Sequence, residues 1–240
     1  SMIKIKYSVM KKLTEDTFIA IRNVGLFNTV KLYISVILDR LFDYDSKYDL
    51  IESLDPRETI PDHPNVKNAT IYVPTRVRPF MKMLKALNLE IDKTVFIDFG
   101  CGKGRALLSA ADFGIKTVKG VEFCDKLSSI ALKNSQIYSK QQVSRNVKFE
   151  IINDDMSLYT LGNLDNLFYF YNPCNEFVLE KVIQNIIYSF SVKPRIGTIV
   201  YQNNIINHPT IFDNYKELSF LFCKEFVGNK FFVYKIDLKN

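Results

Sequence analysis

Apolar and polar positions follow two different rhythms along the 240 residues of this chain. Up to about residue 90, apolar residues recur every three or four positions, which predicts amphipathic helices within residues 1–45 and over about 75–87. The stretch between them, residues 46–70, is polar and carries three prolines, so it is expected to be a connecting loop. The apolar helix positions are Val30, Ile34, Ile37, Leu38 and Leu41, then Val77, Phe80, Met81, Leu84 and Leu87.

After the second of these helices, short β-rich runs alternate with helical ones. The predicted strands span 94–99, 117–123, 147–153, 166–171 and 197–202, and the predicted helices span 105–113, 125–139 and 176–190. This alternation predicts βαβ units and a parallel sheet. Two final apolar runs, 218–226 and 230–236, predict an antiparallel hairpin with Gly228 and Asn229 at its turn. The expected class is therefore α/β, with a mostly parallel seven-stranded sheet that ends in this hairpin.

A glycine-rich loop follows the first predicted strand. Glycines at 100, 102 and 104 permit positive φ and let a ligand approach the backbone closely. Asp98 stands just before them, where its carboxylate can accept from an amino group but would repel a pyrophosphate. Asp98 thus favours S-adenosylmethionine (SAM) over a dinucleotide.

Acidic residues also end the next two predicted strands. Glu122 is placed to accept hydrogen bonds from ribose hydroxyls, a role that dinucleotide-binding folds share. Asp154 and Asp155, followed by Met156, are placed to contact the adenine amino group and flank its ring, with Asp154 preferred as the contact. Each acid alone also fits a turn or a solvated strand end. Their occurrence in order along one βαβ pattern favours a nucleoside site.

The end of the fourth predicted strand carries the candidate catalytic residues Tyr171, Asn172 and Pro173. SAM brings an activated methyl group, so a protein has mainly to align the acceptor and exclude water. A general base is needed for a hydroxyl acceptor and less for an amine. No base is evident there, and Asn172 can accept from an amine N–H, so an amine acceptor is expected. The alternative is that Asn172 and Pro173 only end the strand, and His208 is a weaker candidate for the acceptor pocket.

Several of these motifs resemble those of a known group of enzymes. Residues 96–105 resemble the FVDFGSGKGR signature of a group of small bacterial class I SAM-dependent methyltransferases, with Cys101 in place of the usual serine. Further matches at 40–43, 72–75, 120–122, 131–134 and 170–173 extend the resemblance from about residue 38 to 203. The element at 72–75 and the loop are more distantly similar to the seven-β-strand protein lysine methyltransferases. Cys174 departs from the usual phenylalanine after Asn-Pro, which sets the acceptor pocket apart.

The resemblance implies a Rossmann-like class I methyltransferase fold with an N-terminal helical extension, and SAM as the cofactor. It also implies that Tyr72 and Thr75 lie over the methionine end of SAM, although Thr75 also fits a helix cap. Residues 1–70 are expected to form the helical extension and loop, and residues 71–240 the SAM-binding domain. The residues expected to bind the cofactor are Tyr72, Thr75, Asp98, Gly100, Cys101, Gly102, Gly104, Arg105, Glu122, Asp154, Asp155, Met156 and Asn172.

The composition of the chain limits the kinds of partner that we expect it to bind. The chain is 47% hydrophobic and 24% charged, as soluble globular proteins are. Its net charge of +6 comes from basic residues scattered among acids, so a nucleic-acid partner is disfavoured. The four cysteines include no C-x-x-C pair, so no metal is expected. The longest apolar stretch, 30–42, contains charges, so neither a membrane span nor membrane-surface contact is expected.

The first residues show no apolar core followed by small residues, so the expected location is cytoplasmic. The leading hypothesis is methyl transfer from SAM to an amine, either a protein lysine or a small amino-bearing molecule. Two alternatives stay open: a nucleic-acid methyltransferase, and a catalytically inactive protein that binds SAM or a nucleoside.

Overall fold

The computed structural model describes residues 26, 30, 34, 48–50, 55, 59, 66–68, 70, 72–204, 208–236 and 238. Of the predicted N-terminal helix, Leu26, Val30 and Ile34 are described, and all three are helical and exposed. The rest of that helix and the segment at 40–43 lie outside the described residues.

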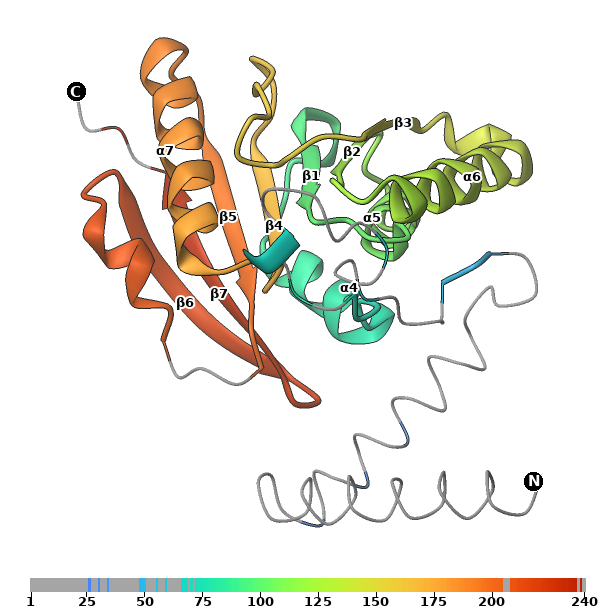
Figure 1. The fold of residues 1–240 in the computed structure, drawn as a ribbon, viewed down its shortest axis with the longest axis horizontal. Helices are drawn as coiled ribbons and strands as arrows, with labels where there is room; N and C mark the ends of the chain where they lie inside the picture. Colours follow the sequence, from blue (N-terminus) through green and yellow to red (C-terminus); the bar gives the residue numbers. More distant parts are fainter. Residues whose placement is uncertain are drawn as a thin grey trace.

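A seven-stranded sheet organises the described chain, as the sequence predicts (Figure 1). Its order is β3-β2-β1-β4-β5-β7-β6. The first five of these strands are parallel, and β7 is antiparallel to both β5 and β6. The strands are β1 (Val95–Phe99), β2 (Thr117–Val121), β3 (Lys148–Ile152), β4 (Leu167–Tyr171), β5 (Gly197–Gln202), β6 (Leu218–Phe226) and β7 (Asn229–Ile236).

Helices cover both faces of the sheet. The helices are α4 (Val77–Ala86), α5 (Arg105–Phe113), α6 (Asp125–Gln141) and α7 (Glu176–Val192), with short 3-10 turns η1 (Val66–Asn68), η2 (Ile91–Lys93), η3 (Val143–Arg145) and η4 (Thr210–Asn214). One core packs the sheet against α4, α5 and α6, and a second packs it against α7 and η4. Figure 1 shows α7 beside β4 and β5.

Successive strand residues enter opposite cores, as the pleat requires. In β1, Phe96 belongs to the core under α4–α6 and Ile97 to the core under α7. In β4, Tyr169 belongs to the core under α4–α6 and Phe168 to the core under α7. Both faces are therefore buried, which explains why these strands read as nearly continuous apolar runs.

The hairpin turn differs by one residue from the prediction. The left-handed positions are Val227 (φ 52°) and Gly228 (φ 72°), and Phe226 pairs with Asn229 in the ladder. Asn229 therefore starts β7 and is not part of the turn; it is buried, and its Oδ1 accepts from Gln202 Nε2 at 3.1 Å. A two-residue turn of this kind needs positive φ at both positions, which forces the β-branched Val227 into an unfavourable region.

The connection from β3 to β4 contains no helix. Residues 153–166 cross as turns and extended segments. Asn185 Nδ2 on α7 donates to Ser157 O at 2.8 Å, and Arg195 Nε donates to Asp165 O at 2.7 Å. The second core is thus closed by α7, η4 and this connection. None of the helices in the described ranges is long and apolar enough to cross a membrane.

Candidate functional site

A pocket opens at the carboxyl ends of β1, β2 and β4. The chain leaves β1 toward α5 on one face of the sheet and leaves β4 toward α7 on the other, so the pocket lies where the winding reverses, the usual ligand position in such sheets. Its lining residues are Thr70, Tyr72, Val73, Thr75, Asp98, Gly100, Cys101, Gly102, Arg105, Ala106, Glu122, Phe123, Leu127, Met156, Tyr171 and Pro173.

The glycine loop forms the floor of this pocket. Gly100, Gly102 and Gly104 have φ values of 79°, 53° and 85°. A Cβ on Gly102 would lie 2.2 Å from the Tyr72 ring, and a Cβ on Gly100 would lie 2.6 Å from Pro173 Cβ. Both positions therefore require glycine for conformation and for space. Gly104 caps α5, and Arg105, its first residue, is buried and lines the pocket.

Glu122 ties the loop to the end of β2. It is buried, its Oε2 accepts from Gly102 N at 2.9 Å, and its Oε1 accepts from Cys124 N at 2.9 Å. The backbone N–H of Phe123 is a third donor that favours the charged form of Glu122, so of the roughly four acceptor sites of a carboxylate about one stays available for a hydroxyl donor of a ligand. Burial raises the pKa of Glu122 to about 7, against the opposing effect of these N–H groups.

Asp98 is the second buried acid of the pocket. It sits in β1 between Gly120 of β2 and Tyr169 of β4. Burial and the nearby charge of Glu122 raise the pKa of Asp98 well above its usual value. A cationic group beside it would offset both effects, so this end of the pocket suits a ligand that carries an ammonium group.

Asp154 and Asp155, the two acids predicted near the adenine, have different surroundings. Phe123 and Met156 border both the main pocket and an adjoining hollow that Asp155 also lines. Asp154 is exposed, and its Oδ1 accepts from Asp155 N at 2.7 Å. Of the two acids, Asp155 borders this hollow and Asp154 does not, and their roles toward a cofactor stay predictions. Phe123 is not among the predicted site residues, although an aromatic residue directly after Glu122 is a usable signal for stacking on a ligand ring.

Asn172 turns away from the pocket. Its φ is 41°, and its Oδ1 accepts from Tyr201 Oη and from Asn203 Nδ2, each at 3.1 Å. Both acceptor sites of that oxygen are therefore occupied. Asn172 is not among the lining residues, whereas its neighbours Tyr171 and Pro173 are. Thr70 also donates to the Asn172 carbonyl through Oγ1 (2.7 Å) and to the Pro173 carbonyl through its backbone N–H (3.2 Å).

A neutral polar network lies behind the acceptor end. Thr75 Oγ1 is 3.4 Å from Tyr169 Oη, which in turn donates to Gln202 Oε1. Thr75 is not a helix cap, because Arg76 holds the N-cap position of α4 and no side chain caps it. Asn204 Nδ2 donates to Tyr171 Oη at 3.4 Å, and burial raises the pKa of Tyr171.

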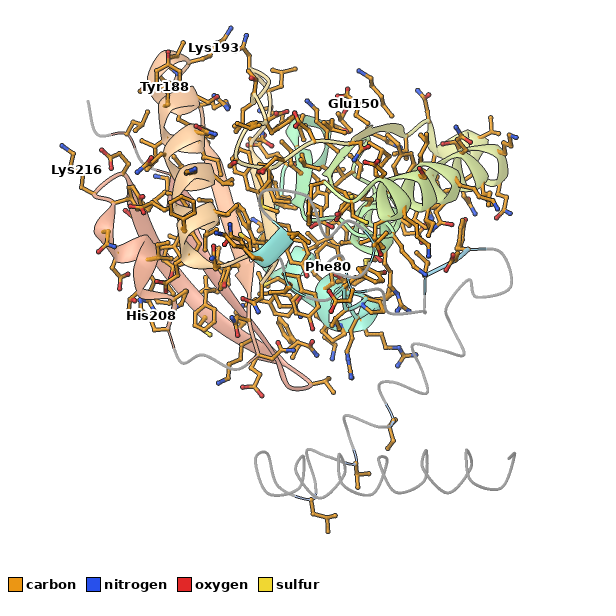
Figure 2. All side chains as sticks on the ribbon, viewed as in Figure 1. Phe80, Glu150, Tyr188, Lys193, His208 and Lys216 are labelled. Carbon is orange, nitrogen blue, oxygen red and sulfur yellow. The ribbon has the colours of Figure 1, made fainter. Side chains whose placement is uncertain are left out.

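Two other candidate residues, Cys101 and His208, make their described contacts with neighbouring groups of the protein. Cys101 packs onto β2: a Cβ on Gly120 would lie 2.6 Å from its Sγ, and burial raises its pKa well above the usual value. His208 does not line the pocket. It lies near β6, apart from Phe80 of α4 (Figure 2), and its Nε2 is 2.8 Å from Asp213 Oδ2. Among the described residues, no group of three potential ligands could hold a metal ion.

Comparisons with known proteins bear on the fold. A sequence model of a family described as "Histone methylation protein DOT1" matches residues 61–153. A putative methyltransferase, yhhF, from Escherichia coli has 16% identity and a TM-score of 0.50, over 69% of this chain and 88% of that chain. A SAM-dependent methyltransferase from Aquifex aeolicus has 14% identity and a TM-score of 0.50, over 76% and 99%. The search of curated proteins gave no match. The chain has the Rossmann-like fold of class I methyltransferases.

Proposed function

We propose that this protein is a class I methyltransferase that uses SAM as its cofactor. The observation that carries the proposal is the pair of buried acids, Asp98 and Glu122, beside a loop in which Gly100 and Gly102 leave no room for a Cβ. Burying two carboxylates is costly unless a ligand supplies partners. SAM fits, because it offers an ammonium group and two ribose hydroxyls. The matching family and the similar structures are themselves described as methylation proteins.

SAM supplies a methyl group that is already activated by the sulfonium, so the residues of this chain bind, orient and exclude water. Asp98 would hold the ammonium group and Glu122 the ribose hydroxyls. Phe123 and Met156 would flank the adenine, and Tyr72 would cover the loop at Gly102. Arg105, Cys101 and Thr75 complete the lining at the same end.

The proposed acceptor is an amine. Among the described residues that line the pocket, the only acids are Asp98 and Glu122, at the cofactor end, and none is a histidine. The raised pKa of Tyr171 makes it a poor base. A hydroxyl acceptor would need a base, whereas an amine needs only to arrive unprotonated. The DOT1 description supports a protein amine, and a small amino-bearing molecule is the other candidate.

The side chain of Asn172 does not receive this amine in our proposal, because two donors already occupy its Oδ1. Tyr171 and Pro173 line the pocket instead, and Tyr171 Oη and the Pro173 carbonyl each accept from one donor of the protein. A carbonyl oxygen has two acceptor sites, so Pro173 O can take a second donor.

The test is methyl transfer from labelled SAM into a lysate of cells that lack the gene, with Asp98→Ala as the control. We expect a labelled species that is lost with protease or passes a size filter, and no label with the variant. Label removed by nuclease would reject the amine acceptor in favour of nucleic acid. Calorimetry that shows no SAM binding to the pure protein would reject the proposal as a whole.

A further inference from the structure

Residues 48–50, which we call the clasp, pack onto the cofactor loop although they precede the sheet by more than 40 positions. Tyr48 and Leu50 are 4% and 1% exposed and belong to the core under α4–α6. Asp49 lies between them. Its backbone hydrogen-bonds to the buried Asn134, and its carboxylate is half-exposed. Tyr48 and Leu50 of the clasp are therefore packed into the same core as helices α4, α5 and α6.

Lys103, in the middle of the glycine loop, is the loop's contact with the clasp. Its side chain is 2% exposed, and its Nζ lies 2.6 Å from Asp49 Oδ1. Lysine is almost never fully buried unless it is paired, because an isolated buried charge is strongly unfavourable. The buried position of Lys103 thus depends on the carboxylate that the clasp supplies.

Asn134 of α6 joins the two segments from the other side. Its Oδ1 accepts from Asp49 N at 3.2 Å, and its Nδ2 donates to Asp49 O at 3.1 Å and to Lys103 O at 3.0 Å. The buried side chain of Asn134 therefore hydrogen-bonds to the backbone of both the clasp and the loop. Loop and clasp cannot shift independently without breaking these bonds.

The clasp also holds the covering side of the pocket. Tyr72 Oη donates to Leu50 O at 3.2 Å, and the Tyr72 ring lies against Gly102. Gly102 N in turn donates to Glu122. A continuous set of contacts thus runs from Asp49 through Lys103 and Tyr72 to the acid proposed to bind the ribose.

We propose that the Asp49–Lys103 ion pair makes Lys103 a positioning residue for the cofactor: it holds the glycine loop in its binding conformation through the clasp. This inference rests on the proposed function, since it concerns the same pocket. Cofactor binding and clasp docking should stabilise each other, because each favours the same arrangement of the loop.

The first test compares two ion pairs of equal length. Asp49→Asn removes the negative charge of the clasp at a half-exposed position. Glu90→Gln removes the negative charge of the Lys93–Glu90 pair, which is also 2.6 Å long. Both side chains of that pair are exposed, and the pair is remote from the pocket. Titration with SAM, well below the melting temperature of each variant, should show about tenfold weaker binding for Asp49→Asn and no change for Glu90→Gln. Affinity within twofold of the parent for Asp49→Asn would overturn the inference.

A second set of variants separates positioning from stability. Asp49→Glu keeps the charge and should restore most of the SAM affinity. Lys103→Met combined with Asp49→Asn should bind SAM no more weakly than Lys103→Met alone, because both remove the same contact. Simple addition of the two losses would count against the inference.

A third measurement needs no ligand. Amide hydrogen exchange at Gly102 and Lys103 should be faster in Asp49→Asn than in the parent, and unchanged in Glu90→Gln. If the parent binds no SAM, the proposed function fails, yet this exchange still tests the clasp. Unchanged exchange in Asp49→Asn would overturn the clasp even where the parent binds SAM.

Discussion

The two ends of the pocket differ in the chemical groups that form them. At the cofactor end, two buried carboxylates and left-handed glycines face the ligand, and the pKa values of Asp98 and Glu122 are raised by burial. At the acceptor end, amide and hydroxyl groups bond to one another, as Asn172 does with Tyr201 and Asn203. The cofactor end thus holds two buried, ionisable carboxyl groups, whereas the acceptor end is built mainly of hydrogen-bonded amides and hydroxyls, with the positive charge of Arg76 acting on Tyr171. Selectivity at the acceptor end should therefore depend on shape and on this positive charge.

The largest effect should come from the loop. Gly102→Ala places a Cβ about where the Tyr72 ring lies and forces alanine to a φ of 53°. We expect SAM affinity to fall by at least about 100-fold, since steric overlap adds to left-handed strain of roughly 1–2 kcal/mol. Calorimetry with SAM measures the change.

Gly114→Ala is the matched control, because Gly114 also has positive φ but lies at the far end of α5. It should lower the melting temperature and leave SAM affinity intact. Equal loss of affinity in both variants would show that general strain, and not the fit at the loop, governs binding.

An intermediate effect is expected at Glu122. Glu122→Gln keeps the size but removes the charge that accepts the ribose hydroxyls, so SAM should bind roughly 10- to 100-fold more weakly at pH 8, as hydrogen bonds to charged groups are worth about 1.5–3 kcal/mol. Because the pKa of Glu122 is about 7, affinity of the parent should fall as the pH drops through 7. A parent and a variant with the same pH profile would refute this role.

The same group makes stability depend on pH. The pKa of Glu122 is raised in the folded protein, from 4.5 to about 7, so the folded state binds this proton more tightly than the unfolded chain. Its contribution is fully present below pH about 4.5 and is lost as the pH rises through 7. Thermal unfolding without SAM should therefore show a decline over that window that is weaker in Glu122→Gln; Asp98 shifts in the same direction and accounts for the remainder.

The smallest effect should lie at the acceptor end. Tyr171→Phe removes the hydroxyl that accepts from Asn204, and SAM affinity should stay within about twofold. Turnover with the identified acceptor should fall by less than about tenfold, whereas loss of a general base typically costs 10²–10⁴-fold. A loss of that larger size would make Tyr171 a base and favour a hydroxyl acceptor.

Local pattern predicted the sheet well, and Asp98 and Glu122, which it singled out, both line the pocket. The expected strands and helices match the observed elements to within about two residues, and the fold class is confirmed. Glu122 and Asp98 were found because strand ends and a glycine loop place residues by short-range rules. The turn at Val227 was misplaced because propensity favours Gly-Asn, whereas the ladder pairs Phe226 with Asn229.

Long-range contacts were beyond the sequence pattern. The Asp49–Lys103 pair joins residues 54 positions apart, and no periodicity signals it. The orientation of Asn172 depends on its left-handed backbone and on partners from β5 and the residue after it. The sequence pattern thus places Asn172 just after β4, whereas the partners of its side chain are set by the tertiary structure, and its catalytic role stays a prediction. The cofactor roles of the individual residues, and the boundary between residues 70 and 71, stay predictions.

The contact between Cys101 and Gly120 bears on how such sequences can diverge. The Cys101 side chain fills the space that a side chain on Gly120 would need, with Leu107 Cδ1 at 2.7 Å from the same point. Position 101 can therefore accept serine, which is smaller, without any change elsewhere. Any residue larger than glycine at position 120 would require simultaneous reduction at 101 and 107. A larger residue at position 120 should therefore occur only together with smaller residues at 101 and 107, whereas position 101 can become smaller on its own.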